Sequence, residues 1–73
     1  MNKKHYPPEG FAERITRIFY NSGKTHVEIG KLLGVDRRTV YQYEKGTIAP
    51  NIMVLAKICK EFDVAADYLL FGK

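Results

Sequence analysis

Five long polar or aromatic side chains recur at regular spacing in a short segment near the middle of the chain. Arg37, Tyr41 and Lys45 stand four residues apart, and Arg38 and Gln42 repeat the same interval beside them. In a helix, this spacing places both rows on one face. Arginine forms paired hydrogen bonds with O6 and N7 of guanine, and glutamine forms them with N6 and N7 of adenine. The segment therefore carries side chains suited to read base edges in a DNA major groove.

The residues around this face predict two short helices joined by a tight turn at Gly34. Thr25 followed by Glu28 is a capping box that starts the first helix, and Asp36 is an N-cap residue that starts the second. Gly46 ends the second helix, because glycine readily adopts the left-handed conformation common after a helix. Two helices joined in this way are typical of a helix-turn-helix, whose second helix enters the major groove.

Three further helices are predicted outside this pair. The first begins near Pro8 or Glu9 and ends at residues 21–23, and the fourth follows the N-cap residue Asn51. The fifth spans roughly residues 66–71. The apolar residues expected to face the core are Phe11, Ile15, Ile18, Phe19, Ile29, Leu32, Leu33, Val40, Tyr43, Ile52, Leu55, Ile58, Cys59, Phe62, Leu69 and Leu70. Since no segment shows the alternating pattern of a strand, we expect an all-α fold of five helices.

Composition favours one small domain in a reducing compartment. The chain has 73 residues, of which 45% are hydrophobic, and its single cysteine, Cys59, lies in an apolar helical pattern. No apolar run approaches the roughly 18–20 residues needed to cross a membrane, and no signal peptide is present. We therefore expect a cytoplasmic protein without a membrane partner, with a flexible N-terminal arm at residues 1–8 and the domain at residues 9–73.

The positive charge is concentrated in one part of the chain. Residues 1–46 contain nine Lys or Arg and five Asp or Glu, whereas residues 47–73 contain three of each. The net charge of +4 therefore belongs to the part that contains the predicted helix pair. This asymmetry favours a polyanionic partner, although an ordinary solvated surface is an alternative that charge alone leaves open.

The sequence lacks the residue sets of an enzyme or a metal site. It contains no Ser/His/Asp or Cys/His set, no paired carboxylates and no phosphate-cradling glycine loop. His5, His26 and Cys59 do not have the spacing of metal ligands. We therefore expect a protein that is not an enzyme and has no metal or other cofactor.

Residues 11–72 resemble the Cro/lambda-repressor-like helix-turn-helix family, the xenobiotic-response-element type, in the joint register of their helices. The matching motif positions are Gly23, Thr25, His26, Ile29, Gly30, Leu33, Gly34, Val35, Arg37, Arg38, Thr39, Val40, Glu44 and Gly46. Further matches are Pro50, Leu55, Ala56, Ile58, Phe62, Val64, Asp67, Tyr68, Leu69, Leu70, Phe71 and Gly72. The resemblance implies a compact five-helix lambda-repressor-like DNA-binding domain whose second and third helices form the helix-turn-helix.

The resemblance implies two sets of DNA contacts. Arg37, Arg38 and Gln42 occupy family positions that contact bases, in agreement with their side-chain chemistry. Tyr41 is either a further contact to a base or the backbone, or a surface residue packed on arginine. The residues expected to contact phosphates are Thr25, His26, Val27, Lys45 and Thr47. The first three of these start a helix, where backbone N–H groups bind anions.

Two departures from the family pattern affect the first helix of the motif. His26 replaces the usual glutamine, and histidine can donate to a phosphate but cannot form the paired bonds of an amide with a base. Gly30 replaces the common alanine, which keeps the close approach of the two helices but weakens the helix by about 1 kcal/mol.

A third departure concerns Glu44. Phe19 stands where the family often has an arginine that pairs with the Glu44 position, so we expect that ion pair to be absent. Arg14, Arg17 or a backbone group are then the candidate partners of Glu44, and the sequence does not choose among them.

These expectations combine into one leading function and one alternative. The leading function is a sequence-specific DNA-binding transcriptional regulator, a repressor, that binds double-stranded DNA as a homodimer on a near-palindromic operator. Tyr68 and Phe71 either complete the core or form a dimer contact, a role we favour for Phe71. The alternative is the antitoxin of a toxin–antitoxin pair, or a protein-interaction module on the same fold, with a toxin or co-regulator as partner. Lys3, Lys4 and His5 form either a basic arm that reaches DNA or a disordered terminus.

Overall fold

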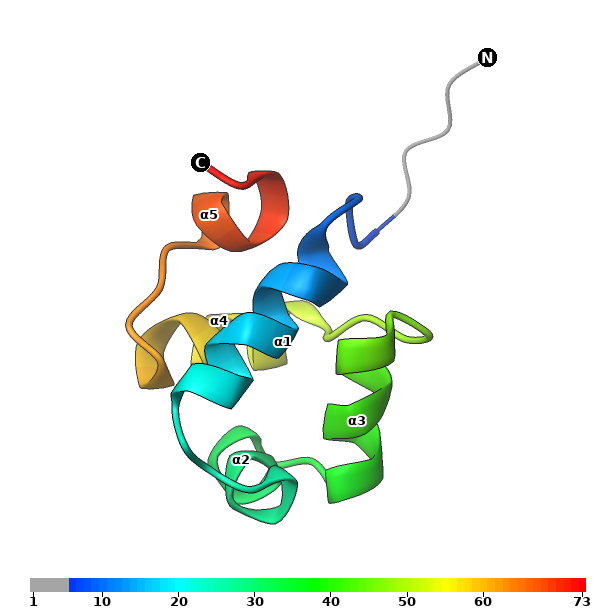
Figure 1. Cartoon of the computed structure of the whole chain (residues 1–73), viewed down its shortest axis with the longest axis vertical. Coiled ribbons are helices and arrows are strands. Elements are labelled where there is room, and N and C mark those ends of the chain that lie inside the picture. The colour runs from blue at the N-terminus through cyan, green and yellow to red at the C-terminus, as the bar shows by residue number, and fades with distance from the viewer. Residues whose placement is uncertain (1–5) are drawn as a thin grey trace.

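The computed structural model describes residues 6–73, which form five helices and no strand (Figure 1). The helices are α1 (Phe11–Asn21), α2 (His26–Leu33), α3 (Arg37–Lys45), α4 (Ile52–Glu61) and α5 (Ala66–Phe71). The expected all-α architecture is confirmed. The part of the predicted N-terminal arm that contains Lys3, Lys4 and His5 lies outside the described residues.

The start of α1 differs from the predicted one. Gly10 has a φ of 88°, in the left-handed region, and therefore cannot continue a right-handed helix from Pro8 or Glu9. Its carbonyl oxygen accepts the first regular hydrogen bond of the helix, from the backbone N–H of Arg14 at 3.0 Å. The first helical residue is thus Phe11, and the prediction near Pro8 or Glu9 was wrong by two to three residues.

Tyr6, within the predicted arm, is held against the domain. Its hydroxyl donates a hydrogen bond of 2.6 Å to the carbonyl oxygen of Pro50, 44 residues along the chain. Its ring lies 6.3 Å from the ring of Phe11. Partial burial raises the pKa of the Tyr6 phenol above its ordinary value. Tyr6 thus contacts both Pro50 and Phe11, the first residue of α1.

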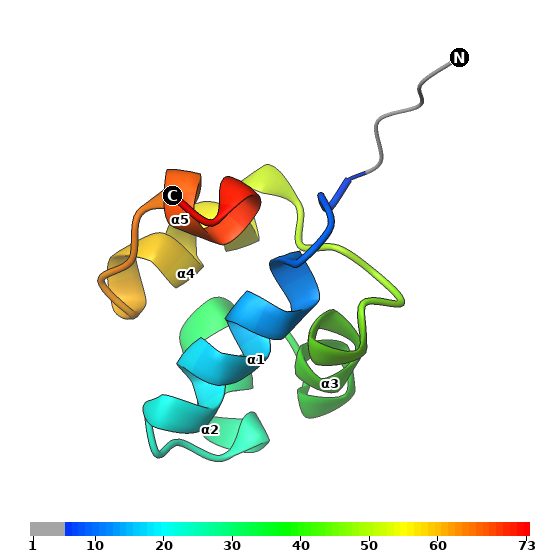
Figure 2. The same cartoon turned by 45° about the horizontal axis from the view of Figure 1, so that its top comes forward.

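The core lies around α1, which runs between the α2–α3 pair and α5 in both views (Figures 1 and 2). Phe11, Ile15 and Phe19 follow one another at four-residue intervals and form its buried stripe. The buried core residues are Phe11, Ile15, Phe19, Ile29, Leu33, Val40, Tyr43, Val54, Leu55, Ile58 and Leu69. This packing holds the N-terminus of α2 and the outer face of α3 in fixed positions.

Several residues expected in the core lie at its edge or outside it. Ile18, Cys59, Phe62 and Leu70 are only partly buried and pack against the core cluster, and Leu32 is half-buried. The prediction for Ile52 was wrong, because this side chain is 75% exposed. Ile52 is the first residue of α4, directly after the N-cap Asn51, and the helix turns Val54, Leu55 and Ile58 inward instead. Among residues 6–73, no helix is long and apolar enough to cross a membrane.

Candidate nucleic-acid interface

The N-terminus of α2 is organised by the predicted capping box. The backbone N–H of Glu28 donates to Oγ1 of Thr25 at 3.1 Å, and the N–H of Thr25 donates to Oε1 of Glu28 at 2.8 Å. These bonds already use the Thr25 N–H, which leaves Thr25 only its hydroxyl proton for a phosphate. The N–H groups of His26 and Val27 have no acceptor within the helix, so they are the backbone donors that an anion can meet.

The turn between α2 and α3 depends on two glycines. Gly34 has a φ of 76°, which favours glycine. At Gly30, an added Cβ would lie 2.5 Å from the carbonyl oxygen of Val35, closer than real Cβ atoms approach. The absent side chain allows the N–H of Val35 to donate to the carbonyl oxygen of Gly30 at 2.9 Å. The two helices of the motif are therefore held at close range by backbone contact.

The start of α3 is fixed by Asp36, as its N-cap position predicts. Its Oδ1 accepts a hydrogen bond of 2.8 Å from the backbone N–H of Thr39. This hydrogen bond holds the pKa of the Asp36 carboxyl below its ordinary value, with a smaller effect from the charge of Arg38. Val40 and Tyr43 bury the inner face of the helix. The opposite face is thereby turned to solvent.

That outer face carries most of the predicted base contacts. Arg37, Arg38 and Tyr41 are exposed and, together with His26 at the start of α2, line one shallow hollow between the two helices. Gln42 is half-buried and lies outside this hollow. The structure thus brings residues of both predicted sets, base and phosphate, to one surface.

Tyr41 packs between two neighbours on this surface. Its ring meets the ring of His26 edge-on, at 6.0 Å between centroids. The ammonium of Lys45 lies 5.3 Å from the centroid of the Tyr41 ring, within the range of a cation–π contact. Tyr41 therefore has aromatic and cation–π contacts with His26 and Lys45, and it shares its hollow with Arg37 and Arg38.

Thr47 follows α3 and is tied to it. Both its N–H and its hydroxyl donate to the carbonyl oxygen of Gln42, at 3.1 and 3.3 Å. The hydroxyl proton of Thr47 is thus already used, and a phosphate contact there has to replace a hydrogen bond. Lys45, by contrast, keeps its ammonium at the surface beside Tyr41.

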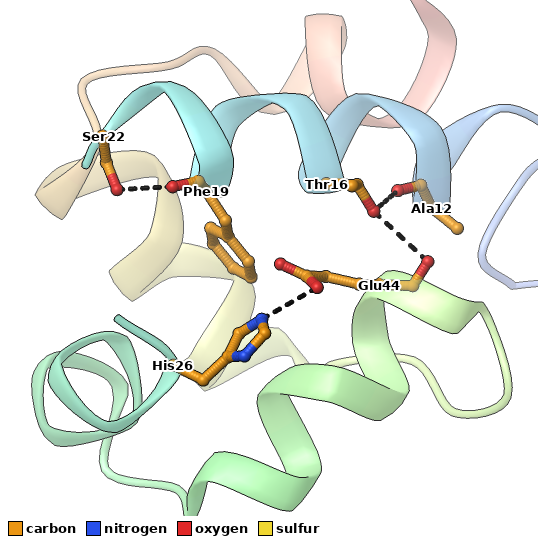
Figure 3. A network of polar contacts seen from close by, with 6 residues as sticks. All are labelled: Ala12, Thr16, Phe19, Ser22, His26 and Glu44. Atoms are coloured by element: carbon orange, nitrogen blue, oxygen red, sulfur yellow. Dashed lines mark hydrogen bonds and ion pairs between the residues drawn. The ribbon is translucent and has the colours of Figure 1, made fainter. Parts of the chain in front are cut away.

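The partner of Glu44 is His26, which was not among the candidates derived from the sequence. Nε2 of His26 lies 2.9 Å from Oε1 of Glu44 (Figure 3). The hydroxyl of Thr16 donates to the backbone carbonyl oxygen of Glu44 at 3.3 Å, which adds a link from α1. Within residues 6–73, neither Arg14 nor Arg17 forms a hydrogen bond or an ion pair with the Glu44 carboxylate. Two departures from the family pattern, at His26 and at Phe19, were the signal that could have identified this pair.

Phe19, which replaces the family arginine, belongs to the core. It is 1% exposed, and its ring lies 5.3 Å from the ring of Phe62. Figure 3 shows it beside the pair of His26 and Glu44. The apolar residue at this position therefore extends the core. Glu44 pairs instead with His26, the first residue of α2.

Comparison with known proteins assigns this arrangement to a family. The helix-turn-helix family model matches residues 14–69. The chain is 38% identical over 45 residues to YgzD of Bacillus subtilis (strain 168), described as an uncharacterized HTH-type transcriptional regulator, and the match covers 62% of this chain and 68% of that protein.

Solved structures show the same fold. The P22 c2 repressor in complex with synthetic operator 9T superposes with a TM-score of 0.81 at 28% identity, covering 86% of this chain and 96% of that chain. A transcriptional regulator from Listeria innocua superposes with a TM-score of 0.78 at 33% identity, covering 86% of this chain and 58% of that one. The chain belongs to the Cro/lambda-repressor-like helix-turn-helix family of DNA-binding transcriptional regulators.

Proposed function

We propose that this protein is a sequence-specific DNA-binding repressor that places α3 in the major groove. The observation that carries the proposal is the single surface formed by His26, Arg37, Arg38 and Tyr41, which unites the N-terminus of α2 with the outer face of α3. The similarity to the P22 c2 repressor, whose structure contains a synthetic operator, supports it.

The proposal gives the residues of this surface two roles. Arg37, Arg38 and Gln42 read base edges, since their side chains offer the paired donors and acceptors that guanine and adenine match. Tyr41 is a further base contact beside them. The phosphate contacts come from the start of α2 and the end of α3, and they set register and orientation. These residues are Thr25, His26, Val27, Lys45 and Thr47.

We further propose that the protein acts as a homodimer on a near-palindromic operator. Two copies related by a twofold axis place their α3 helices in successive major grooves, about 34 Å apart. Large apolar side chains that are exposed on α4 and α5 support self-association. Ile52 and Met53 begin α4 and are 75% and 68% exposed, and Phe71 ends α5 and is 61% exposed.

The test is selection of duplexes from a randomised pool, followed by binding titrations at several salt concentrations. The proposal expects an enriched near-palindromic sequence, because base readers discriminate among duplexes. It also expects affinity to fall steeply as salt rises, because phosphate contacts release counterions. A pool without enrichment, or an affinity that does not change with salt, contradicts the proposal.

A further inference from the structure

The pair of His26 and Glu44 closes the helix-turn-helix at the end opposite its turn. His26 is the first residue of α2, and Glu44 lies in the last turn of α3. Gly34 and Val35 join the other ends of the two helices. A hydrogen bond of 2.9 Å across the open end therefore ties the N-terminus of α2 to α3.

This pair determines which nitrogen of His26 faces outward. An ionised carboxylate only accepts hydrogen bonds, so Nε2 of His26 is the donor to Glu44. The two ring nitrogens are separated by one carbon and point in different directions, and Figure 3 shows only one of them directed at Glu44. The side chain of His26 is 43% exposed, against 16% for Glu44. Nδ1 is thus the nitrogen left for a ligand.

The charged groups around the ring are of both signs. Glu44 contacts it from α3, and Arg37 and Arg38 line one hollow together with His26. Lys24, in the loop before α2, lines a neighbouring hollow with His26. Tyr41 presents its ring edge, with Lys45 beyond it. An anion that enters this surface meets the helix N-terminus and these cations together.

We propose that Glu44 positions His26 so that DNA binding adds a proton to Nδ1. This inference rests on the proposed DNA binding. A neutral imidazole has one N–H group, and this group donates its hydrogen bond to Glu44. Phosphate oxygens only accept, so a neutral His26 would face the phosphate with a lone pair on Nδ1. A hydrogen bond to the phosphate needs the imidazolium, with a proton taken up from solvent, and the ring then lies between two anions.

The consequence is an affinity for DNA that depends on pH through a single residue. Histidine is the side chain whose charge ordinarily changes between pH 5 and 8. Where the free ring is neutral, binding takes up one proton, and the dissociation constant rises by up to about tenfold for each unit of pH. A role that is only structural predicts no such uptake.

The experiment measures the dissociation constant of the selected duplex by fluorescence anisotropy between pH 6 and pH 9 at constant salt. The wild type is expected to lose affinity as pH rises. His26→Gln keeps an amide nitrogen near the position of Nε2, and His26→Asn keeps one near Nδ1, but neither titrates. Both variants are expected to show an affinity that does not change with pH. Circular dichroism at each pH checks that the variants are folded.

Glu44→Gln tests the positioning role with His26 still present. The amide of glutamine can donate to Nε2, which allows a neutral ring to carry its proton on Nδ1 and donate it to the phosphate. The pH dependence is therefore expected to disappear in Glu44→Gln as well. A pH dependence equal to that of the wild type in this variant overturns the positioning role.

The chain contains one other histidine, His5, which provides the matched control. His5→Gln is expected to keep the full pH dependence. The inference is overturned if the wild-type affinity does not change with pH, if the change survives His26→Gln, or if it disappears in His5→Gln. A protein that binds no duplex at any pH overturns the proposed function as well, whereas binding that is independent of pH overturns only this inference.

Discussion

At the residue scale, the α3 surface carries two chemically different kinds of side chain that we propose contact DNA. Arg38 is exposed on the outer face, and Gln42 is half-buried beside it. Both carry groups that form paired hydrogen bonds with one base. Lys45 ends the helix with a compact charge held beside Tyr41, and an ammonium recognises phosphate without regard to sequence.

The first prediction follows from this difference. Arg38→Ala and Gln42→Ala are each expected to relax the preference at one base step, at a cost of about 1–3 kcal/mol for the preferred base pair. Lys45→Ala is expected to weaken all duplexes alike and to lower the salt slope by about 1. Dissociation constants against the selected duplex and its single-base variants measure both effects. A uniform loss in all three variants shows that the base readers are assigned incorrectly.

The second prediction concerns the N-cap of α3. Because the hydrogen bond from Thr39 lowers the pKa of Asp36 below 3.8, its ionised form stabilises the folded state above pH 3.8. This contribution is lost as pH falls through the still lower pKa of the folded protein. Asparagine is an equally favoured N-cap residue that does not titrate. Thermal unfolding of the wild type and Asp36→Asn between pH 2 and pH 6 is therefore expected to show the wild type losing stability relative to the variant below pH 3.8. A constant difference across this range contradicts the assignment.

At the element scale, a side chain of α1 contacts the C-terminal end of α5. A helix of six residues is too short to be stable alone. Nε of Arg14 donates to the carbonyl oxygen of Leu69 at 2.9 Å, which satisfies a group near the C-terminus of α5 and places a positive charge at the negative end of the helix. The guanidinium lies against Gly10 and Gly72, where added Cβ atoms would come within 2.6 and 3.2 Å of Nη1. The two glycines thus make room for Arg14.

The third prediction is that Arg14→Ala lowers the free energy of unfolding by about 1–2 kcal/mol, because the carbonyl of Leu69 loses its donor. Arg17→Ala is the matched control. Arg17 lies one turn further along α1 and is exposed, so its loss is expected to change stability by less than about 0.5 kcal/mol. Urea titrations followed by circular dichroism measure both variants. Equal losses in the two variants would mean that Arg14 does not hold α5.

Helix ends were predictable where the signal is local in sequence. The caps at Thr25, Asp36 and Asn51 each depend on a hydrogen bond to a residue three positions away, and all three form as expected. The start of α1 was not predicted correctly. Pro8 and Glu9 are suited to the first turn of a helix, but the left-handed conformation of Gly10 prevents a helix from beginning there. Because glycine adopts right-handed and left-handed conformations about equally well, the sequence alone does not indicate that the helix begins after Gly10.

Contacts between distant residues were the harder part of the site. His26 and Glu44 are 18 residues apart, and only the packing of α2 on α3 brings them together. His26 differs from the family pattern, and Glu44 lacks its usual arginine partner because of Phe19. The sequence did not show that His26 and Glu44 lie close together in space. The same applies to Ile52, whose apolar side chain fits the helical period yet points to solvent at the first position of α4.

At the scale of the whole molecule, the surface has two kinds of exposed feature. The α2–α3 side carries the charged and aromatic groups proposed to contact DNA. Ile52, Met53 and Phe71 expose apolar area on α4 and α5. Large apolar side chains that remain exposed on a small domain favour contact with another protein. A second copy is the partner that a near-palindromic operator requires, since half-site symmetry mirrors that of the protein.

The fourth prediction tests this homodimer. Phe71→Ser is expected to shift the protein towards monomer in sedimentation velocity, because the dimer loses a large apolar contact. It is also expected to weaken binding to a full operator by about 10²-fold or more, since two linked half-sites bind by avidity. Binding to a duplex with one half-site is expected to stay unchanged. Tyr20→Ser removes another exposed aromatic side chain, at the end of α1, and serves as the control. If both variants sediment like the wild type, Phe71 is not part of a dimer interface. Binding to the full operator then does not depend on a dimer contact by Phe71.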